Sequence, residues 1–344
     1  MEEKHPVVKV SPIFHPWYYE YYYKGLVDFY GEKNVAISYE KRFLSFQKFT
    51  TTKFNKAFFY YEVEISNQTK KVVISAEDWT DINMEVYQDV DIYALVNVYK
   101  EQLEEHSKLF AIGPNFGIRY FSIWNYLKIS WNLKMKAGIT NPHLKAFKNN
   151  TLKRSFYNEF EKKDIKEIPD YTFYLNFPWK KHSDVTDKRT KIIQILKDLV
   201  KNNEISFEGG FAKRRLGYHD GLKELSAQKT YNHSSYLNGV KKSSFVINTP
   251  AVHGCLGWKL GEYLALGKPI ISLPLNRAMP GNFKKNVHYL EIDSIEKDLK
   301  SAILSIRENK DLSISLAKNA SDYYQEYLKP SSVIKRIHTN IFSS

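Results

Sequence analysis

The stretch SFVINTPAVHGCLGWKLGEYLALGKPIIS, residues 244–272, decides the fold class. Its first apolar run ends at Asn248 and leads into a loop that contains Gly254 and Gly257. A short amphipathic segment follows and ends at Gly267, after which a proline opens a second apolar run. Glycine takes the left-handed conformation that ends many helices. The stretch therefore predicts strand, loop, short helix and strand, as in a parallel α/β sheet.

The same alternation of apolar runs and amphipathic segments extends along both flanks of this stretch. Residues 57–75 are typical of a β-hairpin that turns at Asn67-Gln68, and a charged, weakly periodic connection covers residues 141–170. We expect an α/β protein with two domains. Their expected bounds are 1–165 and 166–328, and a C-terminal segment, 329–344, is expected to pack back toward the first domain.

Composition narrows the class of protein. The chain has 344 residues, of which 43% are hydrophobic and 26% charged, which excludes an intrinsically disordered chain. Cys255 is the only cysteine, which excludes a disulfide framework and a thiolate zinc site. Charged residues near the start argue against a secretory signal, and no run approaches the ~20 apolar residues that cross a bilayer. We expect a cytoplasmic protein.

The net charge of +13 suits an anionic partner: a phosphorylated substrate, nucleic acid or an anionic leaflet. Cations and phenylalanines alternate over residues 41–54, a mixture that suits either a membrane interface or an exposed loop. Peripheral docking on the inner face of the membrane is therefore an expectation from charge alone.

The loop and helix of the opening stretch carry the chemistry. Amides near Gly254 and Gly257 can approach a ligand closely, and a helix N-terminus favours phosphate. Lys259 in the first turn opposes the helix dipole by roughly 0.3–1 kcal/mol, which a bound anion would relieve. Glu262 lies three residues later on the same face, so both side chains are predicted to reach one ligand. A surface Lys–Glu pair is the alternative.

Residues 258–271, WKLGEYLALGKPII, resemble the donor-binding signature of GT-B glycosyltransferases. The resemblance implies two Rossmann-like domains that face a central cleft, with the acceptor bound by residues 1–165 and the nucleotide sugar by residues 166–328. It also implies that Glu262 binds the ribose hydroxyls of the nucleotide sugar and that the amides around Gly257 bind its diphosphate. The common retaining branch has a second glutamate eight positions earlier, where this chain has Gly254. His253 could substitute or serve as a structural hydrogen-bonding residue. The Lys259 segment is also similar to inverting fucosyltransferase-like and exostosin-like enzymes, so the stereochemistry stays open.

Further cations are candidates for the departing diphosphate. Arg214 and Arg215 follow a glycine pair, and Lys181 occupies another loop after a strand. Such cations can neutralise a diphosphate without a metal, and a solvated basic loop is the alternative. Asp89-Val90-Asp91 matches a metal-chelating pattern but precedes its apolar run, at the wrong end of the strand. We expect no metal and no cofactor besides the nucleotide-sugar co-substrate.

The loops of the first domain supply candidates for acceptor chemistry. His15 follows the first apolar run and titrates near neutrality, as a catalytic base requires. Glu77 and Asp78 are rival bases, although Asp78 could simply cap a helix. Three further residues are candidates for binding the acceptor: Trp17 by stacking on a sugar face, and Asn115 and Arg119.

The sequence thus predicts a glycosyltransferase, hexosyl or fucosyl, that moves a sugar from a UDP- or GDP-linked donor to a hydroxyl of a glycan or lipid-linked acceptor in surface polysaccharide synthesis. Two alternatives remain. One is a non-enzymatic protein that binds nucleic acid or another polyanion, although no nucleic-acid-binding motif is present. The other is an epimerase or phosphorylase of the same fold.

Overall fold

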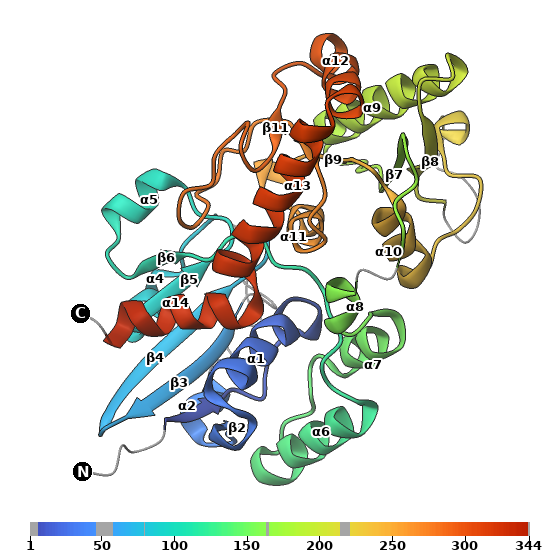
Figure 1. The fold of residues 1–344 in the computed structure, drawn as a ribbon. Coiled ribbons are helices and arrows are strands. Elements are labelled where there is room, and N and C mark those ends of the chain that lie inside the picture. Colours follow the sequence, from blue (N-terminus) through green and yellow to red (C-terminus); the bar gives the residue numbers. More distant parts are fainter. Residues whose placement is uncertain (1–5, 46–57, 79, 163–164, 214–220, 343–344) are drawn as a thin grey trace. The chain divides into compact units, whose positions relative to one another are not determined.

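The computed structural model describes residues 6–45, 58–78, 80–162, 165–213 and 221–342, which form two compact α/β units (Figure 1). The predicted α/β class is confirmed. The chain passes between the units more than once, because two later segments return to the first unit. Unit 1 is Met1–Tyr157, Arg277–Gly281 and Glu326–Ser344; unit 2 is Asn158–Asn276 and Asn282–Gln325.

Unit 1 is built on a six-stranded sheet with the order β2-β1-β3-β4-β5-β6. All neighbouring strands pair in parallel except β3, which is antiparallel to both β1 and β4. The carboxyl ends of the other five strands therefore meet at one edge. The strands are β1 (Val7–Val10), β2 (Val35–Ile37), β3 (Phe59–Ile65), β4 (Gln68–Ser75), β5 (Ile92–Leu95) and β6 (Leu109–Ala111).

The hairpin of β3 and β4 is confirmed, with its turn one residue earlier than expected. Ile65 pairs with Gln68, and the two residues between them, Ser66 and Asn67, have φ of 49° and 67°. Positive φ at both turn positions matches the right-handed twist of a two-residue hairpin. The apolar residues of both strands are buried on the two faces of the sheet, which explains the hydrophobic run that predicted them.

Helices cover the unit 1 sheet. A Cβ at Gly25 on α1 would overlap the carbonyl of Pro330, so glycine allows α1 and α14 to pack closely. The Tyr21 hydroxyl donates to the carbonyl of Leu328 at 2.7 Å. The helices are α1 (Pro16–Tyr30), α2 (Lys41–Ser45), α4 (Met84–Asp89), α5 (Lys100–Glu105), α6 (Ile123–Ala137), α7 (Leu144–Lys153) and α14 (Pro330–Phe342).

A buried carboxylate on α1 fixes the position of α6 and α7. Glu20 is fully buried and accepts hydrogen bonds from the hydroxyl of Tyr126 on α6 and from Asn150 on α7, the latter at 2.6 Å. Its other oxygen accepts from the backbone amides of Tyr120 and Phe121. Burial raises the pKa of Glu20 to about 8, although these four donors favour the ionised form. No pattern in the sequence indicates this network.

Unit 2 contains two groups of parallel strands, β8-β7 and β11-β10-β9. Hydrogen bonds from Ser244 to the carbonyl of Tyr171 and from Thr172 to that of Phe245 join β7 to the segment that leads into β9. The strands are β7 (Tyr171–Asn176), β8 (Ser206–Phe211), β9 (Val246–Asn248), β10 (Ile270–Ser272) and β11 (Leu290–Glu291). The helices are α8 (Asn158–Glu161), α9 (Ser183–Lys201), α10 (His233–Lys242), α11 (Trp258–Ala265), α12 (Ile295–Glu308) and α13 (Lys310–Tyr323).

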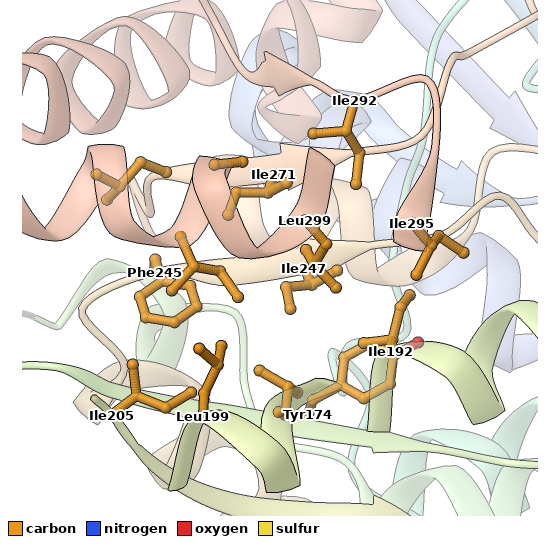
Figure 2. Close-up of a cluster of buried hydrophobic side chains, with 14 of the residues drawn as sticks. Tyr174, Ile192, Leu199, Ile205, Phe245, Ile247, Ile271, Ile292, Ile295 and Leu299 are labelled. Carbon is orange, nitrogen blue, oxygen red and sulfur yellow. The ribbon is translucent and has the colours of Figure 1, made fainter. Parts of the chain in front are cut away.

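The core of unit 2 lies between these strands and the helices α9 and α12 (Figure 2). Ile192 and Leu199 of α9 meet Ile247 of β9, Ile271 of β10 and Leu299 of α12. A buried aliphatic side chain contributes about 1.5–3 kcal/mol on transfer from water, so this cluster holds the strand ends in place.

The structure can be compared with two expectations about membranes. Within the described residues, no helix is both long and apolar enough to cross a bilayer. The candidate interface over 41–54 falls largely outside the described residues, and in the described part Phe43 is fully buried in the core of unit 1. Phe43 is therefore not available to a membrane surface.

Candidate functional site

The predicted donor loop leaves the carboxyl end of β9 and enters α11, as the sequence indicated. Gly257 is the N-cap of α11, and Gly267 follows the helix with φ of 59°. Between β9 and α11, the backbone amide of Ala251 donates to the carbonyl of Cys255 at 2.8 Å, which closes a compact loop. The amides of the first turn of α11 therefore lie at the same edge as the carboxyl ends of β9 and β10.

Lys259 reaches across to the carboxyl end of β7. Its ammonium donates to the carbonyl of Leu175 and to Oδ1 of Asn176, the latter at 2.7 Å. Burial, followed by the charge of Arg189, lowers the pKa of Lys259 to about 7, against the opposing effect of the Glu262 carboxylate. These protein oxygens already offset part of the dipole penalty that we expected a bound anion to relieve.

Glu262 is 3% exposed and points into unit 2 rather than to solvent. Its Oε2 accepts a hydrogen bond at 2.6 Å from the hydroxyl of Tyr236, which α10 supplies. The surface Lys–Glu pair is therefore the wrong description, because both side chains are drawn inward and bind other elements. The buried carboxylate of Glu262 and the ammonium of the half-buried Lys259, one turn apart, form a charged centre on α11.

Three further polar residues join this centre, and the sequence analysis missed all of them. Arg189 on α9 is 7% exposed, and its guanidinium donates to the carbonyl of Phe177 at 2.7 Å. Asn176 ends β7 and Asn248 ends β9, and both are buried. Among the described residues, Nε of Arg189, Nδ2 of Asn176 and Oδ1 of Asn248 have no hydrogen-bond partner. Buried polar atoms without a partner are rare in proteins and point to a missing ligand or water.

Arg189 did leave a signal in the sequence. The buried face of α9 is defined by apolar residues, and Arg189 falls within that face. These apolar residues are Val185, Ile192, Ile193 and Leu196. A charged residue at a core position of an amphipathic helix is seldom buried without a polar partner.

The glycines of the loop have different roles. Gly254 has φ of 70°, and a Cβ there would come within 2.9 Å of the Asn276 side chain, so local structure explains it. Gly257 has an ordinary φ of −82°, and a Cβ would meet only that of Ala251, at 3.9 Å. Local structure does not require glycine at Gly257. His253 is exposed with φ of 58° and packs edge-on against His182 at 5.0 Å.

Of the remaining cationic candidates, the structure describes only Lys181. Lys181 is exposed in the turn before α9. Arg214 and Arg215 lie outside the described residues. The glycine pair before them belongs to β8, where a Cβ at Gly209 would overlap the carbonyl of Tyr174 and one at Gly210 that of Leu225. The pair therefore permits close packing of strands.

At the carboxyl edge of the unit 1 sheet, His15 is the N-cap of α1 and is 4% exposed. Its ring packs against His143 and Trp17, each 5.3 Å away between centroids, and against Tyr18 at 5.6 Å. Trp17 is 37% exposed. An exposed indole edge-on to a buried imidazole is compatible with a sugar site, and the sequence did not indicate His143.

The other unit 1 candidates come from the loops after β4 and β6. Glu77 is half-buried and Asp78 exposed, and the carbonyl of Glu77 accepts a hydrogen bond from Asn97 at 2.9 Å. Asn115 is buried and donates to the carbonyl of Tyr18 at 2.8 Å. The guanidinium of Arg119 stacks over Phe156 at 4.4 Å. Asn115 and Glu77 thus both lie near Tyr18, in the first turn of α1.

No group of three or more His, Cys, Asp or Glu side chains arranged to hold a metal ion occurs within the described part of the chain. Asp89 ends α4, where Lys71 binds it at 3.0 Å, and Asp91 accepts from the Lys71 amide. Both carboxylates lie at the start of β5, away from the carboxyl edge.

No family model matches this chain, and no curated protein matches it in sequence. Among solved structures, a glycosyltransferase from Rickettsia africae is 13% identical over 90% of this chain and 77% of its own, with a TM-score of 0.46. S. aureus TarM is 12% identical over 78% of this chain, with a TM-score of 0.43. WaaG, a glycosyltransferase involved in lipopolysaccharide biosynthesis, is 12% identical over 79% of this chain and 75% of its own, with a TM-score of 0.41.

The chain spans about half of TarM, 48% of its length. Glycosyltransferases are thus among the solved structures that this chain resembles. At these TM-scores and identities the likeness by itself assigns no activity to the chain.

Proposed function

We propose that this chain is a glycosyltransferase of the GT-B type that uses a nucleoside diphosphate sugar. The observation that carries the proposal is the charged centre on α11, where the half-buried Lys259 and the buried carboxylate of Glu262 stand one turn apart beside a helix N-terminus. A diphosphate suits the helix amides and cations, and a ribose diol suits a carboxylate. Unpartnered polar atoms of Arg189, Asn176 and Asn248 at the same strand ends support a polar ligand there.

In this proposal the protein supplies charge and position. Lys259, Arg189 and the α11 amides stabilise negative charge that develops on the departing diphosphate. The transition state at the anomeric carbon has oxocarbenium character, as in other glycosyl chemistry. The proposed acceptor is a glycan or lipid-linked hydroxyl at the carboxyl edge of unit 1, where His15 removes its proton and Trp17 stacks on the sugar.

The proposal is tested by a donor screen that measures nucleotide release from UDP- and GDP-linked sugars, with and without acceptor glycans. We expect release from one donor class that depends on an acceptor. His15→Ala should lower kcat by about 100- to 10,000-fold, the usual worth of a general base, while donor affinity is unchanged. Thr69→Ala, an exposed position beside the β3–β4 turn and far along the chain from both sites, is the control.

Three outcomes would contradict the proposal. Unchanged transfer rates in His15→Ala would remove it as the base. Donor turnover without any acceptor would favour an epimerase or phosphorylase. Absence of nucleotide binding together with strongly salt-sensitive RNA binding would favour the polyanion-binding alternative, because counterion release makes such binding fall steeply with salt.

A further inference from the structure

Helix α6 (Ile123–Ala137) has two apolar faces. Tyr126, Ile129 and Leu133 are buried and form its inner face. The helix packs on α7, which packs on α1, so α6 lies outermost in this layer of unit 1 (Figure 1). One apolar face is enough to explain why the helix folds onto the protein. The second face therefore needs another explanation.

The second face is a stripe of large, exposed apolar side chains. Trp124 is 75% exposed, Leu127 48%, Trp131 64% and Met135 64%. Their spacings of three, four and four residues place them along one side of an α-helix, at 100° per residue. By the same geometry the stripe lies nearly opposite the inner face. Scattered surface apolar residues are ordinary, but an aligned stripe with two tryptophans marks an interaction surface.

The charge around this stripe is of one sign. From His106 to Asn158 the chain contains no aspartate or glutamate, although it has 38 acidic residues in all. Lys128 and Lys134 flank the stripe on α6, and both are exposed. The neighbouring helix α7 continues the pattern with exposed Leu144 and Leu152. The lysines of the two helices are Lys128, Lys134, Lys136, Lys145, Lys148 and Lys153.

We propose that the exposed face of α6 docks on an anionic phospholipid bilayer, with the helix lying in the plane of the interface. Tryptophan is the residue that prefers the headgroup level, and leucine and methionine enter the acyl boundary. Lysines beside the stripe keep their charge in water while their stems follow the apolar surface. A protein groove or nucleic acid would suit the apolar stripe or the positive charge, whereas an anionic bilayer suits both together. The docking goes beyond the proposed donor chemistry and does not depend on it.

The test is co-sedimentation of the full chain with vesicles of phosphatidylcholine alone and of phosphatidylcholine mixed with phosphatidylglycerol. We expect binding to the mixed vesicles that weakens between about 0.1 M and 1 M salt. Trp124→Ser combined with Trp131→Ser should lower the partition coefficient by at least about tenfold. Lys128→Gln combined with Lys134→Gln should lower it by about fivefold per lysine. Trp179→Ser combined with Ile314→Ser removes exposed apolar side chains from unit 2 and should leave the partition coefficient unchanged.

A second measurement keeps the test valid if the variant with Trp124→Ser and Trp131→Ser fails to fold. Phospholipids with brominated acyl chains should quench tryptophan fluorescence of the wild type. The quenching should largely disappear in Trp124→Phe combined with Trp131→Phe, which keeps the apolar stripe and still binds. The proposal is overturned if the wild type ignores anionic vesicles, or if binding is equal in the serine variant and its control. Dimerisation or RNA binding that depends on Trp124 and Trp131, without vesicle binding, also overturns it.

Discussion

Lys259 is the residue whose ionisation should govern ligand binding near neutral pH. Its pKa in the protein is lowered to about 7 by burial, so the free protein loses this charge as the pH rises through 7. A bound diphosphate favours the ammonium and raises that pKa. Affinity for a nucleoside diphosphate should therefore be full below pH 7 and fall above it, by up to about tenfold per pH unit until the raised pKa is reached.

The measurement is isothermal titration with a nucleoside diphosphate between pH 6 and about pH 9. In Lys259→Met the affinity should be lower at pH 6 and almost independent of pH in this range. A wild-type affinity that stays constant across the range would mean that Lys259 does not face the ligand.

At the same scale, the sequence suggested residues for the candidate site but not the partners that their side chains bind. Lys259 and Glu262 were chosen for their spacing on one helix, and both are drawn inward as a charged centre requires. Their partners, Asn176 and Tyr236, come from β7 and α10, far away along the chain. Such partners follow from tertiary packing, which no local pattern encodes.

At the scale of the element, a substitution at the N-terminus of α11 is predicted to affect thermal stability and nucleotide affinity differently. Gly257 has an ordinary φ and room for a side chain. Serine is a better N-cap than glycine, so Gly257→Ser should leave thermal stability unchanged or slightly raised. The added side chain occupies the approach to the helix amides, so nucleotide affinity should fall by about tenfold or more.

Differential scanning calorimetry and titration on the same preparation check this pair of effects. Gly138→Ser, at an exposed helix end where a Cβ meets nothing within 4 Å but φ is 67°, controls for backbone strain. Equal nucleotide affinity in Gly257→Ser and the wild type would place the ligand elsewhere.

Elements with a continuous apolar run bounded by turn residues were the ones that the sequence predicted well. The hairpin of β3 and β4 and the β9-α11-β10 unit follow from apolar runs and turn residues. Helix α6 was not predicted, because apolar residues on both of its sides blur the periodicity of a one-sided helix. Gly209 and Gly210 were expected to follow the end of a strand and to precede a basic loop, whereas they lie inside β8, where close backbone packing requires them.

At the scale of the whole molecule, the sequence did not predict how the chain passes between the two units. Arg277–Gly281 belongs to unit 1 although it lies between two segments of unit 2. Arg277 stacks its guanidinium on Tyr99 at 3.8 Å, and the amide of Ala278 donates to the carbonyl of Val98. These contacts join residues almost 180 positions apart, and no periodicity within a segment can indicate them.

The central claim is that the charged centre on α11 binds a nucleoside diphosphate sugar. It is tested most directly by the equilibrium affinity of Glu262→Gln and the wild type for UDP and GDP. The wild type should bind one of them with little dependence on salt. Glu262→Gln should bind it about 10- to 100-fold more weakly, the worth of hydrogen bonds to a charged group, with its unfolding temperature nearly unchanged. Equal affinities in a folded variant, or no binding of either nucleotide by the wild type, would contradict the claim.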